Sequence, residues 1–104
     1  MKATSVSISD AAVSDIVEQA DWYEAQSGRP VAIRWEKAVT SALLRIVKIP
    51  AAGTLCSFDS LELRHVRRTL IAGFPKHLIF YSFSGGQVSV LRVVHGARDL
   101  ERLL

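Results

Sequence analysis

Two apolar stripes with helical spacing occupy the first half of the chain and constrain the fold most strongly. Over 10–26, and again over 30–49, apolar residues recur every three or four positions, as in amphipathic helices. Ser9 and Asp10 supply an N-cap and a first-turn acid for the first helix, and Pro30 suits the first turn of the second. The link at 26–29 is so short that the helices must form an antiparallel hairpin. Such a hairpin buries its stripes against another layer.

The second half of the chain supplies that layer as strands. Three segments are rich in Leu, Val, Ile, Phe and Tyr: 61–70, 77–83 and 87–95. The turn sequence Ser84-Gly85-Gly86 predicts a hairpin between the last two. Phe74-Pro75 is expected to break the chain between the first two, since proline cannot donate to a strand ladder.

The ends of the chain complete the predicted order. Alternation over 4–8 indicates a short edge strand, and 99–104 is expected to form one helical turn. The prediction is an α+β fold in one domain over residues 1–104. Its order is β-α-α-β-β-β: an N-terminal strand, an antiparallel two-helix hairpin and a three-stranded antiparallel meander.

Both faces of the predicted sheet are apolar. Simple alternation places Val88, Val90 and Val94 on one face and Leu91 and Val93 on the other. In the preceding strand it places Leu78 and Phe80 on one face and Ile79, Tyr81 and Phe83 on the other. Because one helical hairpin covers one face, we expect part of the second face to be covered by the C-terminal tail or, preferentially, by another protein.

Composition excludes several classes of protein. With 104 residues, 49% hydrophobic and 22% charged, the chain is too apolar to be disordered. The single Cys56 excludes an internal disulfide and, having no cationic motif near it in sequence, is expected to be unreactive. No apolar run is long enough for a membrane span, and the N-terminus does not resemble a secretory signal, so we expect a cytoplasmic protein without membrane partners. The three histidines lack metal-site spacing, and we expect neither metal nor cofactor.

Charge is unevenly distributed along the chain. Residues 1–60 carry a net charge of −1, whereas residues 61–104 carry +4. Such asymmetry favours an anionic partner for the second half, although a solvated surface explains it equally well. The helical carboxylates are interpreted as a solvated face: Asp15, Glu18, Asp21 and Glu24.

The basic residues of the predicted strands suggest one possible chemistry. Arg64, Arg67 and Arg68 lie on one predicted strand and Arg92 on another, so their side chains can converge beside His95. Arginine binds phosphate bidentately, and histidine can transfer a proton near neutral pH, which together would make a metal-free site for RNA cleavage. The alternative is that these are ordinary outward-facing residues.

Several segments resemble ParE toxins of the ParE/RelE toxin–antitoxin superfamily. The strongest resemblance is in the C-terminal block. It consists of His77-Leu78-Ile79-Phe80-Tyr81 and of residues 90–99, whose sequence is VLRVVHGARD. Segment 12–23 resembles the first helix of the family. Similar features continue through the middle of the chain: Ile49-Pro50 with Gly53, Leu63-Arg64 with Arg67-Arg68, and Gly73-Phe74-Pro75.

The resemblance implies a small toxin that a cognate antitoxin neutralises by wrapping around it. ParE-like members inhibit DNA gyrase with no known catalytic set, whereas RelE-like members cleave mRNA on the ribosome. The ending of this chain is ParE-like, and it lacks a dense lysine cluster and a tyrosine after the last strand, so we expect gyrase inhibition. The alternatives are a ribosome-dependent endoribonuclease with Arg64, Arg68, Arg92 and His95 as catalytic residues, or a weakly toxic member that acts only with its antitoxin.

Five residues are candidates for partner binding: Arg67, Tyr81, Arg98, Trp22 and Trp35. For the two tryptophans, burial in the core of the helix hairpin is the preferred interpretation. The second interpretation places them in a groove that binds the antitoxin.

Overall fold

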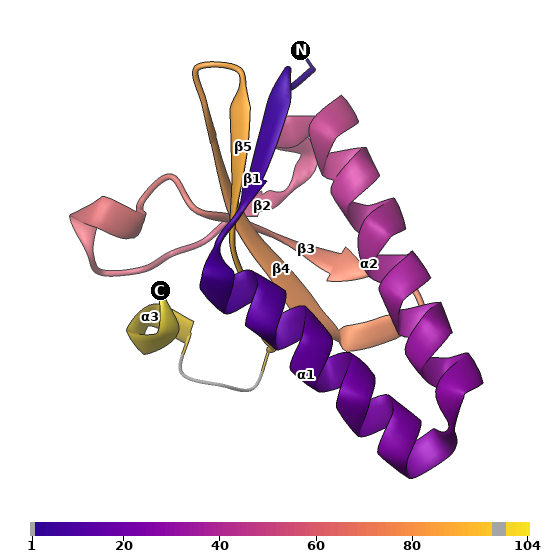
Figure 1. Cartoon of the computed structure of the whole chain (residues 1–104). Helices are drawn as coiled ribbons and strands as arrows, with labels where there is room; N and C mark the ends of the chain where they lie inside the picture. The colour runs from indigo at the N-terminus through magenta and orange to yellow at the C-terminus, as the bar shows by residue number, and fades with distance from the viewer. Residues whose placement is uncertain (1, 97–99) are drawn as a thin grey trace.

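Two long antiparallel helices pack across one face of a five-stranded sheet (Figure 1). The computed structural model describes residues 2–96 and 100–104. The elements are, in chain order, β1 (Ser5–Ile8), α1 (Asp10–Ser27), α2 (Arg29–Lys48), the 3-10 turn η1 (Pro50–Ala52), β2 (Thr54–Leu55), the 3-10 turn η2 (Leu61–Leu63), β3 (Arg67–Ile71), β4 (Phe74–Ser84), β5 (Gln87–His95) and α3 (Leu100–Leu103).

The helix hairpin agrees closely with the sequence prediction. The Ser9 side chain caps α1, because its Oγ accepts a hydrogen bond from the Ala12 amide at 3.0 Å. Gly28 alone separates the helices, and its φ of 89° lies in the left-handed region that glycine adopts without strain. Its amide donates to the carbonyl of Glu24 at 3.0 Å, which ends α1 and lets α2 begin at the next residue.

The sheet is mixed, which corrects the prediction in one respect. Its strand order is β1-β5-β4-β3-β2. The antiparallel meander β3-β4-β5 is present as predicted, and a two-residue strand, β2, extends it at one edge. At the other edge β1 pairs with β5 in parallel, with Ser5 opposite Gln87 and Ile8 opposite Val90. The first and last strands of the chain therefore lie side by side (Figure 1).

Two predicted strand boundaries are wrong. The segment 61–66 forms η2 and a turn, so β3 begins at Arg67. In contrast, Phe74-Pro75 does not break the chain but begins β4. The pairing of β3 with β4 shifts between Leu70 and Ile71, which aligns Ile71 with Phe74 and leaves Pro75 at an irregularity, where a missing amide donor costs least.

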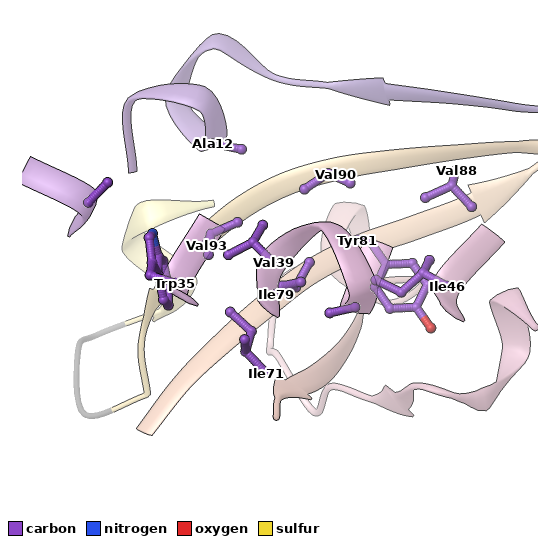
Figure 2. Close-up of a cluster of buried hydrophobic side chains, with 12 residues drawn as sticks. Ala12, Trp35, Val39, Ile46, Ile71, Ile79, Tyr81, Val88, Val90 and Val93 are labelled. Atoms are coloured by element: carbon purple, nitrogen blue, oxygen red, sulfur yellow. The ribbon is translucent and has the colours of Figure 1, made fainter. Parts of the chain in front are cut away.

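The larger core lies between the helices and the sheet. Trp35, Val39 and Ile46 of α2 point toward the strands, with Ala12 and Ala20 contributed by α1 (Figure 2). The sheet supplies the other buried members: Ile71, Ile79, Tyr81, Val88, Val90 and Val93. The indole Nε1 of Trp35 donates to the carbonyl of Ile16 at 3.1 Å, so the largest buried side chain also links the two helices.

A smaller core lies on the opposite face of the sheet. Its buried members are Cys56, Val66, Phe80 and Val94. Residues of the β2–β3 connection and of the C-terminus pack against them: Phe58, Leu63, Leu103 and Leu104, beside Leu78 and Leu91 of the sheet. The tail thus covers part of this face, as one of the two alternatives predicted, and the β2–β3 connection covers it as well.

A bulge in β5 changes which residues face the helices. Tyr81 pairs with Val90 while Phe80 pairs with Arg92, so Leu91 has no register partner. The alternation resumes one residue later, which turns Val93 toward the helices and Val94 toward the smaller core. The prediction that Val94 shares a face with Val88 and Val90 is therefore wrong, whereas the two predicted sets in β4 are confirmed.

Candidate functional site

The structure does not bring the predicted basic residues together beside His95. Arg68, Phe80 and Arg92 form one cross-strand row, and Phe80 belongs to the smaller core. His95 instead pairs with His77, whose ring lies 4.9 Å from that of Trp35 on the helix side. The side chains of Arg92 and His95 therefore project from opposite faces of β5.

Arg92 forms a bidentate ion pair with α1. Its Nε and Nη2 atoms donate to Oδ2 and Oδ1 of Asp15, both at 2.7 Å. Asp15 Oδ2 also accepts the Val93 amide at 3.0 Å, and Arg92 Nη1 donates to the carbonyl of Leu103 at 3.1 Å. The hydrogen bond to Asp15 raises the pKa of Arg92. Arg92 thus joins α1, β5 and α3, and its guanidinium is already occupied by protein partners.

The other three arginines have separate surroundings. Arg64 is exposed and its Nε donates to Nε2 of His65 at 3.2 Å. Arg67 Nη1 donates to the carbonyls of Ala51, at 3.0 Å, and Gly53, at 2.7 Å. Arg68 lies beside Cys56, where its charge opposes the effect of burial, yet burial is the larger effect and raises the pKa of the thiol. A raised pKa favours the protonated thiol, which is the less nucleophilic form.

Tyr81 is an anchor for the segment after α2. It is 1% exposed, its hydroxyl donates to the carbonyl of Pro50 at 2.7 Å, and the Gly53 amide donates to it at 3.0 Å. Burial raises the pKa of this phenol. A Cβ atom at Gly53 would lie 2.2 Å from the hydroxyl oxygen, so only glycine fits there. Tyr81 and Arg67, two of the candidates for partner binding, thus both form hydrogen bonds to the turn at 50–53.

The two tryptophans differ sharply in exposure. Trp35 is 0% exposed, which confirms its expected place in the core, whereas Trp22 is 55% exposed. The core interpretation is therefore wrong for Trp22, and this large aromatic surface is available to a partner. Arg98, the fifth candidate, lies outside the described residues.

Trp22 borders a groove that the sequence did not reveal. This groove, here called the α1–β5 groove, has a volume of ≈ 570 Å³ and is lined by Asp15, Glu18, Gln19, Trp22, Tyr23, His77, Val93, Val94 and His95. It forms because β1 ends at Ile8, so that α1 crosses the part of β5 that is paired with β4 on one side and has no strand on the side of β1. The signals in the sequence were the adjacent Trp22-Tyr23 pair on an acidic helix and the histidines that begin β4 and end β5.

Aromatic rings form one side of the α1–β5 groove. The ring of Tyr23 lies 5.4 Å from Trp22 in an edge-to-face arrangement and 6.4 Å from His77, measured between centroids. His77 and His95 are 5.6 Å apart. Burial, followed by the neighbouring His95, lowers the pKa of His77, so this imidazole is neutral at pH 7. Within residues 2–96 and 100–104, no group of three or more His, Cys, Asp or Glu could hold a metal ion.

Comparison with known proteins defines the class of fold and then the family. A solved structure described as a chromosomal ParDE TA system from P. aeruginosa superposes with a TM-score of 0.72, covering 88% of this chain and 94% of that chain at 14% identity. The chain thus has a ParDE-type fold. The family model described as the ParE toxin of the type II toxin–antitoxin system parDE matches residues 6–100. The chain belongs to this ParE toxin family. Among curated proteins no match is found.

In the described part of the chain, no helix is both long enough and apolar enough to cross a membrane.

Proposed function

We propose that this chain inhibits DNA gyrase by binding to it in the cytoplasm, and that a cognate antitoxin neutralises it. The observation that carries the proposal is the family match, which extends over residues 6–100 and includes every strand of the sheet except the first residue of β1. Membership in a toxin–antitoxin family makes an antitoxin the expected partner. Gyrase is the expected target because the C-terminal block is ParE-like.

The arrangement of the arginines supports binding over RNA cleavage. A metal-free RNA-cleaving site needs a guanidinium and a proton-transferring group on the same phosphate. Arg92 forms a bidentate ion pair with Asp15, and the side chain of His95 projects from the other face of β5. Arg64 lies in the β2–β3 connection, apart from the row that holds Arg68. These positions do not assemble the four residues of the endoribonuclease alternative.

A paired assay tests the proposal. The purified chain is added to gyrase supercoiling reactions and, separately, to an in vitro translation reaction. We expect loss of supercoiling or accumulation of cleaved DNA, together with intact transcripts, and we expect a cognate antitoxin to restore supercoiling. The same protein, denatured by heat before the assay, serves as the negative control.

Three outcomes would redirect the proposal. Full gyrase activity at excess protein, with continuing DNA replication in expressing cells, would contradict gyrase inhibition. Transcript cleavage that His95→Ala abolishes without unfolding the protein would establish the endoribonuclease alternative. Ordinary growth on expression without antitoxin would identify a weakly toxic member of the family.

A further inference from the structure

Helix α1 has a charge opposite to that of the rest of the molecule. The chain as a whole carries +3, yet α1 contains five carboxylates and no basic residue. Two of these carboxylates, Asp15 and Glu18, line the α1–β5 groove. Asp15 already binds Arg92 and the Val93 amide. Glu18 is exposed and acts on Arg92 through its charge, so its carboxylate is the one offered to a ligand.

The same groove offers an exposed aromatic surface. Glu18 and Trp22 are four residues apart on α1 and so lie on the same side of the helix. Trp22 is more than half exposed, and Tyr23 and His77 continue the aromatic lining inward. An indole face beside a carboxylate is suited to a flat cation, which can stack on the ring and donate to the carboxylate at once.

Among the residues that the structure describes, the lining of the groove includes no lysine and no arginine. Arg92, the partner of the lining residue Asp15, is compensated by that carboxylate in a bidentate pair. Burial keeps His77 uncharged at neutral pH. The two carboxylates among its described lining residues therefore favour cations over phosphates in this groove.

We propose that the α1–β5 groove is a binding site for a guanidinium group, with Glu18 as its ion-pair partner and Trp22 as its stacking surface. A guanidinium fits better than an ammonium because its planar fork can stack and donate simultaneously, whereas an ammonium is a strongly hydrated point charge. The group comes either from a free arginine derivative or from an arginine side chain in a peptide. This proposal is independent of gyrase inhibition.

A nuclear magnetic resonance titration tests the site. Argininamide is added to the full chain labelled with ¹⁵N, at pH 7 and low ionic strength. We expect the indole signal of Trp22 and the amide signals of residues 15–23 and 93–95 to shift. The indole signal of Trp35, whose Nε1 is hydrogen-bonded to the Ile16 carbonyl, should not shift. Shifts that avoid these residues would overturn the proposal.

Matched variants separate the site from general attraction to an acidic helix. Glu18→Gln and Trp22→Leu should each weaken argininamide binding about two- to five-fold, as expected for an exposed ion pair or cation–π contact. Glu24→Gln removes one charge from the same helix outside the groove and should leave the Kd unchanged. Equal weakening by Glu24→Gln and Glu18→Gln would show general electrostatic attraction and overturn the site.

Two capped peptides identify the source of the cation. Gly-Gly-Arg-Gly-Gly and Gly-Gly-Lys-Gly-Gly are titrated in the same way. Tighter binding of the arginine peptide than of argininamide would assign the site to a protein side chain, and the reverse order would assign it to a free arginine derivative. A lysine peptide that binds as tightly as the arginine peptide would contradict guanidinium recognition.

Discussion

The two faces of the sheet are buried by different kinds of structure. On one face, α1 and α2 cover a core that includes Trp35, Ile79 and Val93. On the other, the β2–β3 connection and the short C-terminal helix cover Phe80 and Val94. The helices of the first face have continuous backbone hydrogen bonding. The cover of the second relies on a few contacts, such as the Cys56 amide donating to the Val66 carbonyl at 2.9 Å.

This difference implies unequal local stability. A cover built from long helices can open only when whole helices leave the sheet, whereas a connection and a terminal turn can open separately. We therefore expect the helix-covered core to determine global stability and the smaller core to open more readily. The following predictions test this comparison in order of decreasing effect.

Trp35→Ala should have the largest effect. Removal of the fully buried indole leaves a cavity between α1, α2 and the sheet, and should lower the free energy of unfolding by about 3–5 kcal/mol. Urea denaturation followed by far-ultraviolet circular dichroism measures the loss. Trp22→Ala, at an exposed position of α1, should change it by less than about 0.5 kcal/mol. Similar losses in both variants would contradict the assigned core.

Asp15→Asn tests the link between the two faces. The variant removes the charge that Arg92 pairs with and should cost about 1–3 kcal/mol, because the partly buried guanidinium loses its bidentate ionic partner. Thermal unfolding measures the change. Asp21→Asn, on the same helix outside the groove, is the control and should be neutral. A neutral Asp15→Asn would mean that solvent replaces the pair without cost.

Val93→Ala and Val94→Ala compare the two faces directly. The residues are neighbours with nearly equal exposure, 3% and 4%, but belong to different cores. Val93→Ala removes two methyl groups and should lower the free energy of unfolding by roughly 1–2 kcal/mol. Val94→Ala should lower it less, because the β2–β3 connection and the C-terminus can move to fill the cavity. Equal costs in urea denaturation would show that the smaller core is as rigid as the larger.

Acidification should weaken the helix-covered face slightly. The pKa of His77 is lowered in the folded protein, so the unfolded chain binds more protons once the pH falls toward the ordinary histidine value. This contribution is complete above about pH 6.5 and decreases as the pH falls below it. His77→Phe, which keeps an aromatic ring against Trp35, should reduce the dependence of unfolding free energy on pH between 7 and 5. An unchanged slope would show that other groups cause it.

Local patterns predicted most of the helix-covered face. The helical periods, the Ser9 cap and the Ser84-Gly85-Gly86 turn act over a few residues, and each appears where expected. Parallel pairing of β1 with β5 joins residues more than 80 positions apart, which no local period encodes. The turn at 61–66 has an apolar composition like that of a strand, because it buries Val66 and Leu63 in the smaller core.

The candidate site was less predictable than the fold. Adjacent arginines in a sequence do not reveal which partners occupy them, and Asp15, the partner of Arg92, lies 77 positions away. The groove beside Trp22 depends on where β1 stops and α1 crosses β5, which is a property of the assembled sheet. Trp22 lies four residues after Glu18 on α1, so its position along the helix agrees with its exposure rather than with a place in the core.

The bulge at Leu91 also bears on how the length of this chain can vary. Without Leu91, Val90 and Arg92 would pair with consecutive residues of β4, and the side chains beyond would keep their present faces. Deletion of any single residue from 92 to 94 would instead exchange the faces of the residues that follow within β5. Position 91 is therefore a point in the last strand where this chain can lose a residue without moving His95 out of the groove or Val94 out of its core.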